Sequence, residues 1–146
     1  MSRDRVDLAA GAVLHIQDFS SRGHPAKNKY LLIIGSISDS EVLGFLISSQ
    51  LGYLKQEGYR KEVVRIPDRA TAFLRSESII QCFELECLSI GSLCGGFERG
   101  LVTNAGRLPI RYLHKVREAV TESRLLPQID IERALRILPP ASPTQQ

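Results

Sequence analysis

The sequence predicts a mainly β fold with helices at its C-terminal end. Short apolar runs rich in β-branched residues recur from residue 11 to about residue 103, with Gly-, Ser-, Asp- or Pro-containing turns between them. After Pro109 the apolar residues change to helical spacing. With 146 residues, 43% hydrophobic and 24% charged, the chain matches one globular domain. We therefore expect a small, strongly curved sheet or barrel with helices packed against it.

The first strands form a hairpin in this interpretation. Residues 13–16 are a short apolar strand that ends at Asp18 and a polar loop. Residues 31–35 are a continuous apolar run, which is typical of a strand buried on both faces. Residues 36–40 contain Ser and Asp side chains that can bond the local backbone, so they form the turn before a return strand at 42–47.

The following segment predicts further short strands. A loop at 51–59 leads to a β-rich run at 62–66 that ends at Pro67. Strands are expected at 79–85, 88–93 and 101–103. Gly95 and Gly96, which follow each other, predict a turn or sharp bend.

Two helices are expected after the strands. Ile110, Leu113, Val116 and Val120 share one helical face, and Pro109 suits the first helical turn. A second helix is expected at 128–138, between two prolines. We expect a single domain at 1–138 and a disordered, proline-rich tail at 139–146.

Composition limits the function classes only broadly. A net charge of +3 permits binding to a polyanion without requiring it. Cys82, Cys87 and Cys94 form no C-x-x-C pair, so buried thiols are expected rather than a metal site or disulfides. No apolar run approaches the roughly 20 residues of a membrane span, and the first residues lack a signal-peptide core. We expect a cytoplasmic protein that does not enter a membrane.

Five segments in a fixed order carry a resemblance to a known family. They are Gly-Ala-Val-Leu-His-Ile at 11–16, Lys-Asn-Lys-Tyr-Leu-Leu-Ile-Ile at 27–34, Ile-Ser-Ser-Gln at 47–50, the segment from Leu74 to Leu85, and Gly-Leu at 100–101 before the helix. Across residues 11–123 this order resembles the PemK/MazF-like toxins. The resemblance implies an SH3-like small β-barrel with a C-terminal helix, which forms a homodimer. It also implies a metal-independent endoribonuclease that cleaves single-stranded RNA, needs no cofactor and is neutralised by an antitoxin protein.

The resemblance assigns two catalytic positions. In the family, an arginine and the first Thr or Ser of the second strand's end are associated with RNA cleavage, and here these positions are Lys29 and Ser48. The chain departs from the pattern, with Lys29 for arginine and Tyr30 for proline. Lys29 can stabilise a pentavalent phosphorane, although a solvated loop lysine is an equal alternative. Ser48 can donate to a phosphate oxygen or bond its own backbone.

Further RNA-binding residues are expected near these two positions. His24 and Lys27 precede Lys29, and the histidine titrates near neutral pH. Ser49 and Gln50 follow Ser48, and Gln50 can bond a base edge. Arg75 can contact phosphate. No Asp/Glu and His set of fixed spacing identifies the group that takes the 2′ proton.

The loop at 55–61 has two interpretations. Tyr53 and Tyr59 lie among Lys55, Arg60 and Lys61, and aromatic side chains among cations can stack bases. Because Glu57 and Glu62 are also present, a solvated loop is favoured.

The same residues leave a second function open. A catalytically silent barrel of the same fold could bind a protein or a nucleic acid, and related barrels include toxins that poison gyrase. This alternative predicts a groove that binds its ligand but does not cut RNA.

Overall fold

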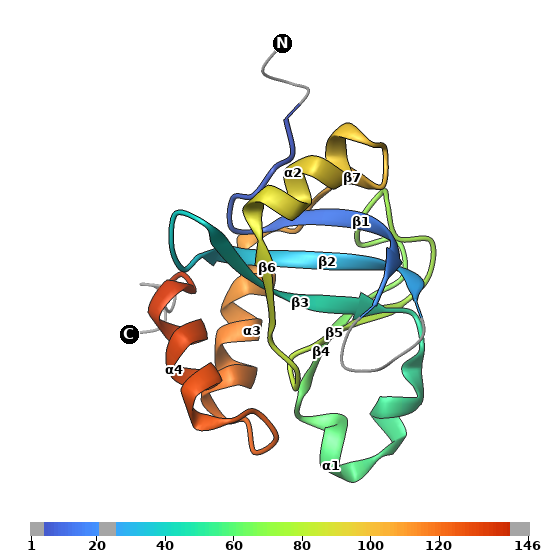
Figure 1. The fold of residues 1–146 in the computed structure, drawn as a ribbon. Coiled ribbons are helices and arrows are strands. Elements are labelled where there is room, and N and C mark those ends of the chain that lie inside the picture. The colour runs from blue at the N-terminus through green and yellow to red at the C-terminus, as the bar shows by residue number, and fades with distance from the viewer. Residues whose placement is uncertain (1–4, 21–25, 141–146) are drawn as a thin grey trace.

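A computed structural model describes residues 5–20 and 26–140, and it confirms a mainly β protein with helices at its C-terminal end (Figure 1). The strands of its seven-stranded sheet are β1 Ala12–Phe19, β2 Lys27–Ser36, β3 Glu41–Ser48, β4 Val63–Ile66, β5 Ser78–Gln81, β6 Glu86–Ser89 and β7 Val102–Arg107. The helical segments are η2 Leu51–Lys55, α1 Glu57–Arg60, α2 Ile90–Glu98, α3 Ile110–Thr121 and α4 Gln128–Ile137.

The strand pairings are antiparallel and follow the order β4-β5-β3-β2-β1-β7. β4 and β7 lie at the two ends of this order and do not pair with each other within the described residues, so the sheet is open. β3 is its centre, because β2 occupies one edge of β3 while β6 and β5 share the other edge.

β5 and β6 behave as one strand interrupted by a large bulge. Gly44 of β3 pairs with Glu86 of β6, and Ile47 of β3 pairs with Ile80 of β5. Between these pairs β3 has only Phe45 and Leu46, whereas the opposing chain has residues 81–85. We call residues 81–85 the bulge. Extra residues in one strand bend it and redirect its side chains, and such bulges are common beside functional sites.

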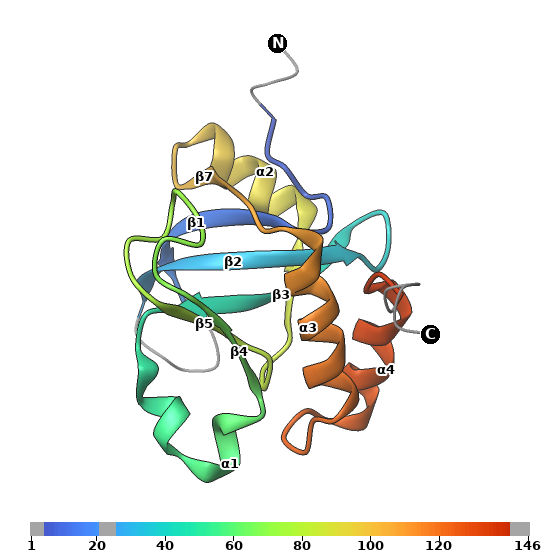
Figure 2. The ribbon, with the colours of Figure 1, turned by 180° about the vertical axis from the view of Figure 1, so that it is seen from behind.

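The two faces of the sheet bury separate cores. On the α3 face, Leu32, Phe45 and Ile80 pack with Val116 of α3 and Ala134 of α4, and all five are buried. Figure 2 shows α3 in front of the sheet on this face. On the opposite α2 face, alternate strand residues pack with Leu93 of α2; they are Leu14, Leu31, Ile33 and Val42. The period-two alternation of these apolar residues therefore feeds both cores.

The largest error of the sequence-based fold is α2. Residues 88–93 were expected as a strand and Gly95-Gly96 as a turn, but the chain becomes helical at Ile90. The Ser89 hydroxyl accepts the backbone N–H of Ser92, which caps the helix start. A Cβ on Gly96 would lie 2.8 Å from Cγ2 of Val102, so the glycine serves close packing of α2 on β7.

Other elements differ mainly in their ends. β1 and β2 extend beyond the expected 13–16 and 31–35, and the expected strand at 79–85 stops at Gln81, where the bulge begins. The expected loop at 51–59 contains η2 and α1. The bounds of β4 and α4 are confirmed within one residue. The start of α3 is confirmed as well, and its end was not predicted. Of the tail expected to be disordered, residues 141–146 lie outside the described part.

The cysteine prediction is correct for only one residue. Cys82 is buried in the α3-face core, whereas Cys87 and Cys94 are exposed. Cys87 lies on β6 with its Sγ 3.4 Å from the Glu41 carboxylate and 3.7 Å from Nη2 of Arg133.

Among the residues that the structure describes, no helix is both long and apolar enough to cross a bilayer.

Candidate functional site

The β2–β3 hairpin brings Lys29 and Ser48 together. Tyr30 pairs with Ile47 in the ladder, so the next residues outward, Lys29 and Ser48, come opposite each other. Residues directly opposite in an antiparallel pair project from the same face, with Cβ atoms about 5 Å apart. Both side chains are half-buried and line the same two pockets. The ammonium and the hydroxyl thus converge at one end of the hairpin.

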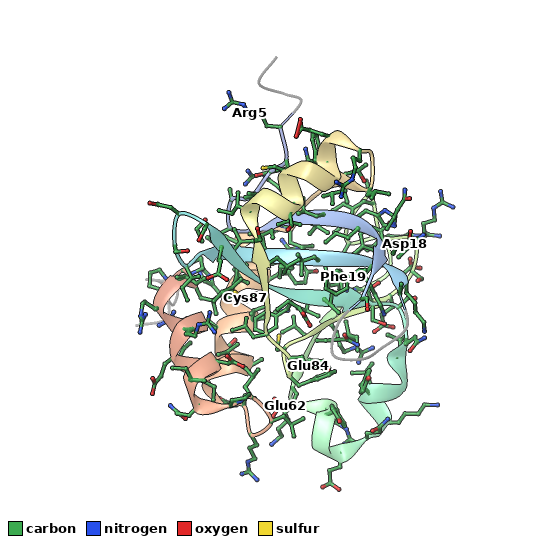
Figure 3. The ribbon with its side chains drawn as sticks, in the orientation of Figure 1. Arg5, Asp18, Phe19, Glu62, Glu84 and Cys87 are labelled. Atoms are coloured by element: carbon green, nitrogen blue, oxygen red, sulfur yellow. The ribbon has the colours of Figure 1, made fainter. Side chains whose placement is uncertain are left out.

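The first pocket, which we call the bulge pocket, lies on the α2 face. It has a volume of about 160 Å³. Strand ends, η2 and the bulge each contribute to its wall, which consists of Phe19, Lys27, Lys29, Leu46, Ser48, Gln50, Tyr53, Gln81, Glu84 and Glu86. In Figure 3, Phe19 is labelled at the end of β1 and Glu84 below it, in the region of the bulge.

The second pocket, which we call the loop pocket, lies at the same hairpin end. It has a volume of about 380 Å³ and is wider than the bulge pocket. The β2 and β3 ends form one wall, and the segment before β5 forms the other. Its lining residues are 27–30, 47–50, 73–76 and Ser78.

The two pockets differ in charge. The loop pocket has the cations of Lys27, Lys29 and Arg75, and among its described lining residues none is acidic. The bulge pocket combines two of these lysines with the carboxylates of Glu84 and Glu86. A polyanion backbone is therefore attracted to the loop pocket, whereas the bulge pocket offers both acceptors and donors.

Ser48 has a local hydrogen bond as well as a place in the site. Its Oγ accepts the backbone N–H of Gln50 at 3.0 Å. A serine hydroxyl has one donor and two acceptor lone pairs, so this bond leaves the O–H able to donate to a ligand. The backbone-bonding alternative for Ser48 is correct, and it orients the hydroxyl without using its proton.

An aromatic cluster supports the outer wall of the bulge pocket. The rings of Tyr53, Tyr59 and Phe83 contact one another pairwise, with centroids 4.9 to 5.0 Å apart. The cluster also packs on Val63 and Ile79. Tyr53 is the member that lines the pocket. Because its neighbours hold it in place, the ring presents a preorganised surface.

The structure gathers the described residues that the sequence singled out. Lys27, Ser49, Gln50 and Arg75 all line the loop pocket together with Lys29 and Ser48. The fifth expected RNA-binding residue, His24, lies outside the described residues. The structure thus brings the six described residues to one pocket, and the role of each side chain in RNA binding stays a prediction.

Sequence reasoning missed the acidic wall. Glu84 and Glu86 stand two residues apart, a spacing that places side chains on one face of a strand, and this was the available signal. The bulge between them and β5 could not be read from the sequence. The solvated-loop interpretation at 55–61 agrees with the exposure of most of this segment, but Tyr59 is half-buried in the aromatic cluster and the adjacent Glu62 is buried.

Glu62 accepts hydrogen bonds that connect two segments of the fold. Its carboxylate accepts from the hydroxyl of Ser123 and the backbone N–H of Arg124. It therefore joins the start of β4 to the segment between α3 and α4, and it lines neither pocket.

Within the described part of the chain, no three His, Cys, Asp or Glu side chains are grouped so that they could hold a metal ion. No model of a known protein family matches this chain, and no curated protein matches it in sequence.

Proposed function

We propose that this protein is a PemK/MazF-like, metal-independent endoribonuclease that cleaves single-stranded RNA in the cytoplasm. The observation that supports this function most directly is the convergence of Lys29 and Ser48 at the border of two pockets. The proposal includes the finer features that the family resemblance implies, namely an SH3-like arrangement of the strands and a homodimer.

The reaction places the scissile phosphate between Lys29 and Ser48. The 2′ oxygen of the preceding ribose attacks phosphorus, and its proton passes to the Glu84 carboxylate, which lines the same pocket. The Lys29 ammonium and the Ser48 hydroxyl stabilise the charge of the phosphorane. The leaving 5′ oxygen takes a proton from solvent, and a 2′,3′-cyclic phosphate remains.

The cations of the loop pocket hold the RNA backbone downstream of the cut. Lys27 and Arg75 line it with the hydroxyl-bearing Ser49 and Ser76. Such contacts release counterions that are condensed on the RNA, and this release is less favourable at high salt. RNA affinity should therefore fall as the salt concentration rises. An antitoxin with an acidic, extended segment would cover this pocket through the same charges.

A second candidate function is a binding module that does not cut RNA. The observation that favours it is the lysine at position 29, because an ammonium is a point charge and cannot grip two phosphate oxygens as a guanidinium does. A protein-binding toxin that poisons gyrase belongs to the same class.

The test is incubation of the purified protein with mixed-sequence RNA in EDTA. We expect products that end in 2′,3′-cyclic phosphate, and a loss of roughly 10²-fold or more in rate for Lys29→Ala. Ser48→Ala should also lower the rate. Lys61→Ala and Ser36→Ala are matched controls, because both residues are exposed and line neither pocket.

Each outcome separates the two candidates. Cleavage lost in the site variants and kept in the controls supports the nuclease. No cleavage by the wild-type protein at any concentration, together with RNA binding that depends on Lys29, supports the binding module. Equal cleavage by all variants contradicts the assigned site.

A further inference from the structure

We propose that the bulge pocket is a subsite for a single nucleobase that carries an exocyclic amino group. The inference rests on the proposed function, because it places the scissile phosphate between Lys29 and Ser48. It adds the base that the site takes and the residue that selects this base.

The shape of the pocket fits one flat ring system. Its volume of about 160 Å³ is below the roughly 300 Å³ at which sites for drug-sized ligands begin. The half-buried rings of Phe19, at the end of β1, and Tyr53, in η2, both line it. Base–aromatic stacking is the usual way in which proteins hold an unpaired base.

Its polar groups select among the bases. Glu86 is buried, with 7% of its surface exposed, and Gln81 lines the same pocket. A carboxylate accepts hydrogen bonds and cannot donate them when ionised, so it pairs with amino groups such as that on C4 of cytosine. Uracil presents its N–H between two carbonyl oxygens, which repel a carboxylate.

Both acidic side chains can accept an additional bond. Glu84 and Glu86 already interact with other groups of the protein. A carboxylate has about four acceptor positions, so one bond already made does not prevent a bond to a base. The two carboxylates then have different roles: Glu84 takes the 2′ proton, and the more deeply buried Glu86 reads the base.

The pocket's position also explains which base is read. Lys29 and Ser48 belong to both pockets, so a phosphate there has the bulge pocket on one side and the cationic loop pocket on the other. The nucleotide whose 2′ oxygen attacks is bonded to the phosphate through its 3′ oxygen. We therefore place its base in the bulge pocket and the downstream chain in the loop pocket.

The experiment titrates the protein with the four nucleoside 3′-monophosphates, which contain no bond to be cut. We expect the cytidine, adenosine and guanosine compounds to bind on the order of 10-fold more tightly than the uridine compound. Glu86→Gln, which keeps the shape of the side chain and adds a donor, should remove most of this difference. Glu57→Gln, an exposed glutamate of α1, is the matched control.

A second variant tests the stacking wall. Tyr53→Leu should weaken all four nucleotides by a similar factor, on the order of 10-fold, because stacking is tolerant of base identity. If Glu86→Gln does not fold, the preference of the wild-type protein and the Tyr53 result still decide the proposal.

The two proposals fail separately. Equal binding of all four nucleotides, or a preference unchanged in Glu86→Gln, would overturn the base subsite even if RNA is cleaved in a Lys29-dependent way. A Glu86-dependent preference in a protein that cuts no RNA would support the subsite and reject the nuclease.

Discussion

The two ends of the β2–β3 hairpin contrast sharply. At the end where β2 leads into β3, Ile34 and Leu43 are fully buried, and Ile137 of α4 packs 3.5 Å from where a Cβ of Gly35 would stand. At the other end, the same two strands carry Lys29 and Ser48 beside two pockets. One ladder is thus covered by a helix at one end and lined by polar side chains at the other.

The difference separates stability from function. Apolar burial supplies most of the folding free energy, and the covered end contributes to it through Ile34 and Leu43. Half-buried lysine and serine side chains contribute little to stability, so under the proposed function their substitution should change RNA cleavage far more than folding. Substitutions at the two ends should therefore affect different measurements.

The largest expected effect is on the rate of RNA cleavage by Glu84→Gln. Glutamine keeps the shape but cannot take the 2′ proton, so the rate should fall by about 10²- to 10⁴-fold. Single-turnover cleavage of RNA at saturating enzyme measures it. Glu98→Gln, at the exposed end of α2, is the control, and a rate for Glu84→Gln equal to that of this control would remove Glu84 from the mechanism.

At the covered end, Leu43→Ala should act on stability instead. Leu43 is fully buried in the α3-face core, and such truncations cost about 2–5 kcal/mol of unfolding free energy. Urea unfolding followed by circular dichroism measures the loss. The folded fraction should cleave RNA at the wild-type rate, and a rate reduced as far as that of Glu84→Gln would mean that the two ends are not independent.

The contrast also shows what the sequence could predict. The continuous apolar run at 31–34 and the polar residues at 27–29 and 48–50 follow directly from composition and period, so the hairpin and its polar end were predictable. The bulge was not, because residues 79–85 read as one continuous strand and the offset between Ile80 and Glu86 exists only against β3. For this reason the acidic wall of the bulge pocket was missed. α2 was missed because its glycines are poor helix formers, and tertiary packing on Val102 overrides that propensity.

Cys82, a fully buried residue of the bulge, predicts a dependence of stability on pH. Burial, and secondarily the charge of Glu62, raise the pKa of the Cys82 thiol above its ordinary value of 9.0. Below pH 9 the folded and unfolded states both keep the proton. Above it only the unfolded state loses the proton, so stability falls by about 1.4 kcal/mol per pH unit.

Urea unfolding of wild type and Cys82→Ala between pH 8 and about pH 10.5 measures this effect, because the thiol titrates in the unfolded state near pH 8.5–9. The variant should be less stable throughout but should lack this part of the slope. Identical slopes would place Cys82 outside the core and would contradict the arrangement in which the bulge turns Cys82 inward and Glu84 toward the pocket.

The smallest expected effect is a gain at the polar end. Lys29→Arg replaces a point charge with a planar fork that can bond two phosphate oxygens, as in the family that the chain resembles. We expect the cleavage rate to rise on the order of 10-fold, within the range that one well-placed donor supplies. Lys61→Arg, on the exposed side of the α1 segment, controls for general effects of arginine on RNA affinity. A rate at or below that of the wild type, with unchanged RNA affinity, would contradict this expectation. It would show that the pocket's shape around the ammonium, rather than the number of donors, limits the reaction.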